Sequence, residues 1–147
     1  MERVFGIIPA SSGPYIFIWA ISIFLIAIIA LFIFIGHSSR NMTFTVSDEG
    51  LSIRGGLYGR TIPRADIVAE EVRVMNLDTE TGYRPKWRTN GIGLPGYSAG
   101  WFKLENNEKA LCFLTDRSRV VYIPTTQDYS VMLSTMDAEE LAGLLKR

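Results

Sequence analysis

Residues 15–35 read YIFIWAISIFLIAIIALFIFI, an unbroken run without a charged residue, a glycine or a proline. At a rise of about 1.5 Å per residue, a helix of this length spans roughly 30 Å, the thickness of the hydrocarbon core of a bilayer. Tyr15 and Trp19 lie near its N-terminal end, where amphipathic rings favour the level of the lipid headgroups. The run predicts a transmembrane helix over residues 15–36, preceded by an N-terminal tail over residues 1–14.

Two other interpretations fit this run less well. A cleaved signal peptide has an apolar region of about 7–15 residues that ends in small residues. Here the run is longer, and the bulky residues Ile33, Phe34 and Ile35 precede Gly36, which is a plausible end for the helix. A buried core helix is usually shorter and carries a polar face. The length and the flanking residues therefore favour a retained membrane anchor.

The basic residues around the run predict its orientation. Arg3 precedes the run and is offset by Glu2, whereas Arg40 follows it closely, with further arginines at positions 54, 60 and 64. Lys and Arg near the ends of a membrane helix favour the cytoplasmic side. The single cysteine, Cys112, cannot form an internal disulfide, which fits a reducing compartment. We therefore expect a single-pass protein of the cell membrane whose larger C-terminal part is cytoplasmic.

Beyond a short linker over residues 37–41, the hydrophobic pattern changes to the alternation that is typical of strands. Gly, Asn, Asp and Pro residues separate the alternating segments and indicate turns. Strands are predicted over residues 42–46, 51–54, 57–62, 67–77, 100–104, 109–115, 119–123 and 129–133.

The last residues of the chain predict a helix. Asp137 and Glu140 have the spacing of a capping box, and an apolar stripe follows at Leu141, Leu144 and Leu145. The sequence thus predicts one domain over residues 42–147, a mainly-β barrel or orthogonal sandwich of about seven antiparallel strands that the C-terminal helix closes. Either arrangement buries the edges of the sheet.

Residues 78–99, DTETGYRPKWRTNGIGLPGYSA, show neither helical nor strand periodicity and predict a long loop. Long loops inside compact domains are often functional. Three cations in this stretch surround Trp87, and the group could lie on anionic lipid headgroups, where each charge contributes on the order of 1 kcal/mol. The alternative is an ordinary solvated loop, in which Arg88 pairs with a carboxylate and Trp87 packs on the barrel. The candidate binding residues are Arg84, Lys86, Trp87, Arg88, Asn90, Gly91, Pro95, Gly96 and Tyr97.

Residues 91–96, GIGLPG, match the pattern G-x-G-x-x-G, and Asp116 lies 20 residues beyond Gly96. A dinucleotide site requires a strand before these glycines and a helix directly after them. The residues that follow resemble a strand, and Pro95 and Gly100 oppose a helix. We therefore favour glycines that serve an irregular loop, and nucleotide binding or an enzymatic domain is kept only as a remote alternative.

Composition argues against several other classes of function. The chain has 15 basic and 15 acidic residues, without the basic excess of nucleic-acid-binding domains. His37 is the only histidine and Cys112 the only cysteine, whereas a metal site of this type needs several ligands. A nucleophile–histidine pair would have to use His37, at the membrane boundary. We therefore expect no enzyme activity, no metal and no cofactor.

Several segments of the extramembrane part resemble those of bacterial PH-like (pleckstrin-homology-like) domain membrane proteins. The similarity covers residues 44–63, 88–104, 110–116 and 120–125, and its most specific piece is Arg88-x-x-Gly91 followed by Pro95-Gly96-Tyr97-x-x-Gly100-x-Phe102. The resemblance implies a PH-like fold in a membrane setting. Inositide-binding PH domains carry a K-x(n)-[K/R]-x-R pattern near the first hairpin, and the arginines at positions 54, 60 and 64 lack that spacing.

Two hypotheses for the function follow. In the first, the protein is a non-catalytic module, anchored in the bilayer by residues 15–35, that binds or scaffolds at the membrane surface. Its partner would be anionic lipid headgroups, another protein, or further copies of the chain in a homo-oligomer. In the second, the chain is an accessory subunit of a larger membrane assembly. The span has no GxxxG pattern, which favours simple anchoring and hence the first hypothesis.

Overall fold

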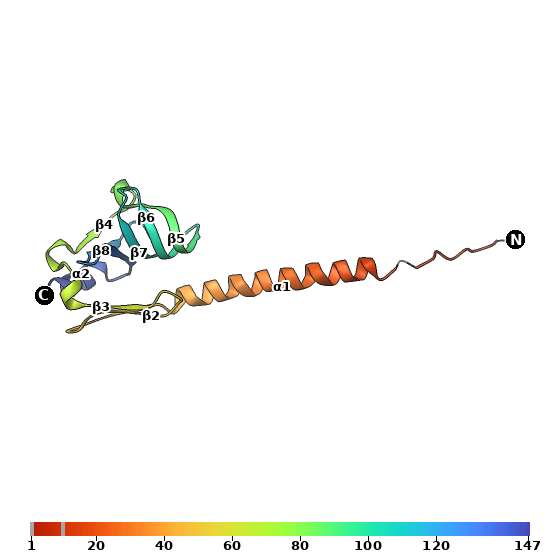
Figure 1. Ribbon diagram of the computed structural model, residues 1–147, viewed down its shortest axis with the longest axis horizontal. Coiled ribbons are helices and arrows are strands. Elements are labelled where there is room, and N and C mark those ends of the chain that lie inside the picture. Colours follow the sequence, from red (N-terminus) through yellow and green to blue (C-terminus); the bar gives the residue numbers. More distant parts are fainter. Residues whose placement is uncertain (1, 10) are drawn as a thin grey trace. The chain divides into compact units, whose positions relative to one another are not determined.

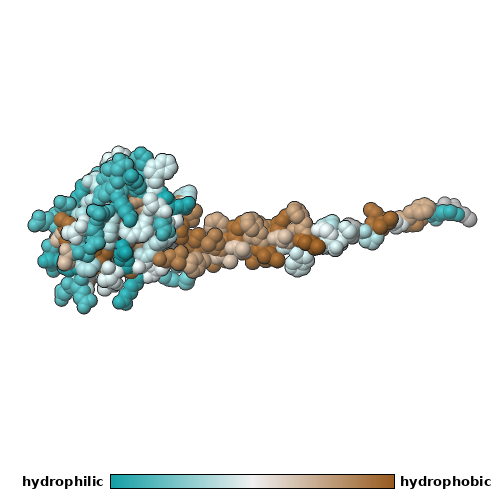
Figure 2. Space-filling view, in the orientation of Figure 1, coloured by the Kyte–Doolittle hydropathy of each residue, from teal (hydrophilic) through white to brown (hydrophobic). Residues whose placement is uncertain are grey.

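The computed structural model describes residues 2–9 and 11–147 and divides the chain into an N-terminal unit that ends at Arg40 and a compact domain, Asn41–Arg147. The first unit contains helix α1, Gly13–Arg40. Within the described residues, α1 is the one helix that is long and apolar enough to cross a membrane. Figure 2 shows apolar side chains gathered along it. The predicted apolar helix is thus confirmed.

Helix α1 extends further at both ends than the sequence predicts. It begins two residues before Tyr15 and continues past Gly36, the expected end, to Arg40. A lone glycine lowers helix stability by only about 1 kcal/mol relative to alanine, so it does not by itself end a long helix. The backbone of the predicted linker is therefore helical up to the first residue of the domain, Asn41.

The domain opens with a three-stranded antiparallel sheet in the order β1-β2-β3. Its strands are β1, Thr43–Ser47; β2, Gly50–Arg54; and β3, Arg60–Pro63. Alternate residues point inward, as the sequence predicts, and Leu51, Ile53 and Ile62 are buried. Gly50, in the turn that opens β2, has a φ of 137° and would place a Cβ against the carbonyl of Ile62.

A six-stranded sheet and a C-terminal helix complete the domain (Figure 1). The order of its strands is β4-β8-β9-β7-β6-β5, and all neighbours are antiparallel except β7 and β9, which are parallel. The elements are β4, Arg73–Met75; β5, Pro85–Leu94; β6, Tyr97–Leu104; β7, Lys109–Leu114; β8, Val120–Pro124; β9, Ser130–Ser134; and α2, Ala138–Lys146.

Both faces of the six-stranded sheet are covered. On one face, residues such as Phe113 and Val131 form a core with the three-stranded sheet and with Leu145 of α2. On the other face, a second cluster includes Cys112 and Met132. Strands β7, β8 and β9 are accordingly buried along almost their whole length, the pattern of strands covered on both sides.

The coarse fold prediction is confirmed: an apolar helix, then mostly β structure, then a C-terminal helix. The finer prediction of about seven antiparallel strands is wrong, because the described residues form nine strands and include one parallel pair. No ladder joins the two sheets within the described part of the chain, so closure into a barrel is not confirmed.

The predicted long strand over residues 67–77 is also wrong. Only Arg73–Met75, β4, forms a strand there, and a 3₁₀ turn, Ala69–Glu71, precedes it. Ile67 forms an isolated bridge with Thr125. Glu70 and Glu71 explain the interruption, because adjacent residues of a strand point to opposite faces and one carboxylate would enter the core. On the turn, both glutamates are exposed.

The predicted loop over residues 78–99 is wrong for most of its length. Strands β5 and β6 form a hairpin there, with a two-residue turn at Pro95 and Gly96. Two bulges, near Lys86 and Thr89, shift the register of β5. These bulges, together with exposed polar residues, erase the alternation by which a strand is recognised. Irregular structure remains only before β5, where a 3₁₀ turn covers Thr81–Tyr83.

The predicted C-terminal helix is confirmed as α2. Asp137 occupies the N-cap position, but its side chain makes no capping hydrogen bond, so the prediction of a capping box is wrong in that part. Leu141 and Leu145 are buried, whereas Leu144 is 40% exposed and lies outside the buried stripe. The buried positions follow the i, i+3, i+4, i+7 spacing of a single helix face.

Candidate functional site

The predicted binding residues lie on one hairpin and the residue before it, but they do not converge on one site. Strand β5 is the outermost strand of the six-stranded sheet and is exposed over most of its length. Arg84 directly precedes β5, Pro95 and Gly96 form the turn, and Tyr97 begins β6. The hairpin thus separates these residues along its length.

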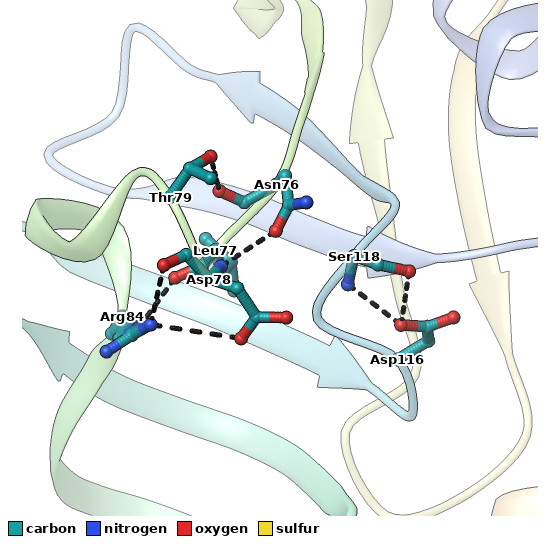
Figure 3. A network of polar contacts seen from close by, with 7 residues as sticks. All are labelled: Asn76, Leu77, Asp78, Thr79, Arg84, Asp116 and Ser118. Atoms are coloured by element: carbon teal, nitrogen blue, oxygen red, sulfur yellow. Dashed lines mark hydrogen bonds and ion pairs between the residues drawn. The ribbon is translucent and has the colours of Figure 1, made fainter.

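Arg84 holds together the loop before β5, which we call the covering loop, residues 76–84 (Figure 3). Its Nε donates to the carbonyl of Leu77 at 2.6 Å, and an Nη donates to the carbonyl of Asp78 at 2.9 Å. Leu77 is fully buried, and its N–H donates to the carbonyl of Arg117 at 2.8 Å. Arg84 therefore satisfies the backbone of the segment that inserts Leu77 into the second core cluster.

The covering loop is braced by two further polar turns. Within it, the Asp78 N–H donates to Asn76 Oδ1 at 2.8 Å. In the turn that contacts it, Asp116 Oδ1 accepts hydrogen bonds from the N–H and hydroxyl of Ser118, at 2.8 and 2.7 Å. These two bonds lower the pKa of Asp116, because they stabilise its charged form. Figure 3 shows both turns from close by.

The other two cations of the predicted cluster differ from Arg84 and from each other. Lys86 forms an ion pair with Glu105 at 3.0 Å. Arg88 is exposed and makes no ion pair with any described residue, contrary to the alternative in which it pairs with a carboxylate. Trp87 is 64% exposed, so it does not pack fully on the sheet as that alternative supposed. The three cations are close in sequence but differ in their partners: Arg84 donates to backbone carbonyls, Lys86 pairs with Glu105, and Arg88 is exposed.

The glycines of the hairpin allow two strands to approach closely. Gly91 lies opposite Gly100, and a Cβ on Gly100 would stand 2.6 Å from the carbonyl oxygen of Asn90. Gly100 also has a φ of 114°, a conformation that favours glycine. Tyr58, from the loop that joins β2 to β3 of the three-stranded sheet, donates from its hydroxyl to Asn90 Oδ1 at 3.2 Å. These residues therefore help to join the two sheets.

The tip of the hairpin contradicts the context that a dinucleotide site needs. Pro95 followed by Gly96, with a φ of 76° at the glycine, has the order of a type II turn. A strand follows this turn where a dinucleotide site needs a helix. Tyr97 is half-buried, and burial raises the pKa of its hydroxyl.

A second group of cations and aromatic rings was not predicted. The Arg60 guanidinium lies over the rings of Trp101 and Tyr129, 5.3 and 5.6 Å from their centroids. The Lys109 ammonium lies 4.6 Å from the same Trp101 ring. The two rings meet edge to face at 5.0 Å. Arg60 comes from β3, Trp101 from β6 and Lys109 from β7, and Tyr129 directly precedes β9, so the group spans both sheets.

Lys103 enlarges this group, which we call the basic–aromatic face: Arg60, Trp101, Lys103, Lys109 and Tyr129. Lys103 lies directly opposite Lys109 in the pairing of β6 with β7. Directly opposed residues point to the same side of a sheet, so two positive charges face each other there. Strand β5 places Trp87 opposite Lys103, at the margin of this face.

The carboxylates nearest in sequence do not neutralise the basic–aromatic face. Glu108 adjoins Lys109 but accepts hydrogen bonds from Tyr122 and Ser130, at 2.8 and 2.6 Å, on the opposite face of the sheet. Asp128 adjoins Tyr129 and forms no ion pair within 4.0 Å among the described residues. The face therefore carries three positive charges without a paired acid in the described part of the chain.

Sequence reasoning missed this face because it depends on register between distant strands. A partial signal existed, since Lys103 and Lys109 flank the predicted turn at residues 105–108 and had to lie near each other. The stacking of Arg60 on Trp101 had no such signal, because it joins residues 41 positions apart across two sheets.

The described residues give no support to a metal site or to a reactive thiol. They contain no group of three His, Cys, Asp or Glu side chains that could hold a metal ion. Cys112 is fully buried, and desolvation raises the pKa of its thiol well above the usual range, so the reactive thiolate is disfavoured. Burial and the hydrogen bond to Glu108 likewise raise the pKa of Tyr122.

Three hollows of the domain, of about 470, 440 and 420 Å³, are lined by residues outside the hairpin and the basic–aromatic face. One of about 470 Å³ lies between β1 and α2 and is lined by residues such as Phe44, Glu140 and Leu141. A smaller one, of about 30 Å³, lies beside Gly96 and Tyr97. Neither has the enclosed, largely apolar character of a small-molecule pocket with convergent polar groups.

Comparison with known proteins places this fold in a family. No curated protein and no solved structure matches the chain. Residues 42–147, which include all nine described strands and α2, match the family described as the bacterial PH domain. The chain therefore belongs to the bacterial PH domain family.

Proposed function

We propose that the chain is a single-pass membrane protein whose PH domain acts as a non-catalytic binding or scaffolding module at the membrane surface. The observation that carries this proposal is the exposed apolar surface of α1, followed without a gap by the domain. Side chains along the helix, such as Phe17, Ile26 and Ile33, are 65–67% exposed. Such a surface is unfavourable in water, at roughly 25 cal/mol per Å², and is satisfied by lipid.

The anchoring proposal is tested by extraction of membranes that contain the full chain. We expect the protein to remain in the membrane fraction after alkaline carbonate and to be released by detergent. A variant that lacks residues 13–37 should appear in the soluble fraction. The matched control is a chain in which the isoleucines of residues 13–37 are replaced by leucine, so that the helix stays apolar. Release of the full chain by carbonate would contradict anchoring.

The orientation rests on the excess of basic residues after the span, and we propose that the domain is cytoplasmic. A reporter fused to the C-terminus, active only on one side of the membrane, tests this. Activity on the outer side would contradict the orientation and leave the anchoring itself intact.

A binding role fits a domain that is already tethered. Tethering raises the local concentration of the domain at the membrane, so a ligand there can be held by modest affinity. The partner is a lipid headgroup, another protein or a further copy of the chain. Cross-linking in native membranes, followed by identification of the attached molecules, tests these choices. A foreign membrane subunit in constant stoichiometry would instead support the role of an accessory subunit.

A further inference from the structure

Three positive charges of this neutral chain lie together on the basic–aromatic face. The chain has 15 basic and 15 acidic residues. Four ion pairs join described residues, and none of them includes Arg60, Lys103 or Lys109 of the basic–aromatic face. Most basic residues of the chain lie outside these four ion pairs, so the feature that requires a physical reason is that three of them gather on one side of the domain.

The first reason to infer a ligand is that the fold holds two of these cations, Arg60 and Lys109, in place. Arg60 stacks on two rings and donates to the hydroxyl of Tyr129 at 3.4 Å, and Lys109 lies over Trp101. Contacts of this kind are attractive and favour one arrangement of a flexible side chain. A ligand that binds ordered cations has less side-chain entropy to overcome.

The second reason is that the arrangement is unfavourable in the absence of a ligand. Lys103 and Lys109 face each other across two strands, and like charges in this position destabilise a sheet. A nearby carboxylate would relieve the repulsion, but Glu108 points to the other face and is engaged by Tyr122 and Ser130. An anion from outside the chain would relieve it equally well.

The third reason is the chemistry of the groups that remain available. A guanidinium has five N–H donors in a planar fork that matches the oxygens of a phosphate, and Arg60 uses only one in a hydrogen bond with a described residue. The two ammonium groups supply point charges beside it. This set suits a compact, multiply charged oxyanion.

We propose that the basic–aromatic face binds a phosphate-bearing anion through Arg60, Lys103 and Lys109. Phosphate of this kind is presented by a phospholipid headgroup or by a soluble phosphate compound, and the site chemistry is the same for both. For the lipid source, the inference rests on the proposed function, because the domain must work at a membrane. For the soluble source, it rests on the domain alone.

The soluble source is tested with pyrophosphate and the full chain in dodecyl maltoside micelles. Trp19 and Trp87 are exposed, so the variant W19F/W87F leaves Trp101 as the reporter of the face. We expect a saturable change in its fluorescence at constant ionic strength. The variant R60Q/K103Q/K109Q in this background should bind pyrophosphate at least tenfold more weakly. The matched control is R54Q, an exposed arginine of β2 outside the face, which should bind as the parent does.

The lipid source is tested with the same reporter in nanodiscs. One set contains phosphatidylcholine alone, and the other also contains anionic phosphatidylglycerol. We expect a difference in Trp101 emission between the two sets that the R60Q/K103Q/K109Q variant loses. A response only to phosphatidylglycerol supports the lipid headgroup, and a response to pyrophosphate supports a phosphate group as the ligand.

Two outcomes would overturn the proposal. One is the absence of any response to either probe, and the other is a response that the triple variant retains. If the triple variant fails to fold, by circular dichroism, the single variant K103Q replaces it, because Lys103 takes part in none of the cation–π contacts with Trp101 and Tyr129. Failure of the carbonate test would remove the anchoring proposal, whereas the pyrophosphate measurement in micelles would still stand.

Discussion

The covering loop and the basic–aromatic face both depend on arginine, but they use its charge in opposite ways. Arg84 directs its N–H donors at backbone carbonyls of its own loop and approaches Asp78 at 3.8 Å. Arg60 lies over two rings and has no acidic partner among the described residues. The first charge is used by the fold, and the second is left for something outside the chain. The groups that surround each guanidinium, and not its charge, therefore distinguish the structural role of Arg84 from the role proposed for Arg60.

The largest expected effect concerns the residue that the covering loop buries. Leu77→Ala should lower the free energy of unfolding by about 2–5 kcal/mol, because it leaves a cavity in a closely packed core. Leu57→Ala, at a side chain that is 67% exposed, should change it by no more than about 0.5 kcal/mol. Denaturant unfolding followed by circular dichroism measures both. Equal effects would show that the loop does not cover the sheet face.

The next prediction separates the two kinds of arginine directly. Arg84→Gln should lower the free energy of unfolding by about 1–3 kcal/mol, because carbonyls of the loop lose their donor. Arg88→Gln is the matched control and should change it by about 0.5 kcal/mol or less. Arg60→Gln should fall between them, with the loss of cation–π contacts worth about 0.5–1 kcal/mol each. A larger loss for Arg60 than for Arg84 would reverse the comparison.

The sequence could predict the apolar helix, most strands and α2, because each is encoded by local periodicity. It could not predict the hairpin of β5, because bulges near Lys86 and Thr89 interrupt the alternation. Nor could it separate Arg84 from Arg88, since their roles depend on which carbonyls and carboxylates lie nearby in space. The basic–aromatic face was hidden for the same reason, as Arg60 and Trp101 meet only when the two sheets pack.

A smaller effect is expected from the opposed lysines. Lys103→Glu should raise the free energy of unfolding by about 0.2–1 kcal/mol, because an opposite charge then faces Lys109. The gain should shrink as salt is added, since the Debye length falls to about 10 Å at 0.1 M. Lys103→Gln should give a smaller gain. Destabilisation by Lys103→Glu at low salt would show that the two lysines do not repel each other.

The smallest expected effect is on the stability of the domain at acidic pH. Hydrogen bonds from Ser118 hold the pKa of Asp116 below its usual value near 3.8 in the folded domain. Because the folded pKa is the lower one, the carboxylate stabilises the domain above the unfolded pKa, and this contribution is lost as the pH falls through the folded pKa. The melting temperatures of the parent and Asp116→Asn should therefore differ at neutral pH and converge below about pH 4.

The same titration distinguishes the two regions. Lysine and arginine keep their charge throughout the acidic range, so the difference between the parent and Lys103→Gln should stay constant as Asp116 titrates. A difference that changed in step with Asp116 would couple the basic–aromatic face to the turn beside the covering loop.

The order of strands has a consequence for synthesis. Strand β9 is the last strand of the chain, yet it lies in the interior of the sheet, between β8 and β7. A ribosome releases the N-terminus first, so β7 and β8 emerge before the strand that must join them. The six-stranded sheet therefore cannot be completed until residues 130–134 have left the ribosome. Helix α1 ends 90 residues before β9 begins and is released long before then. The membrane insertion that we propose for α1 and the folding of the domain would therefore be separate events in time.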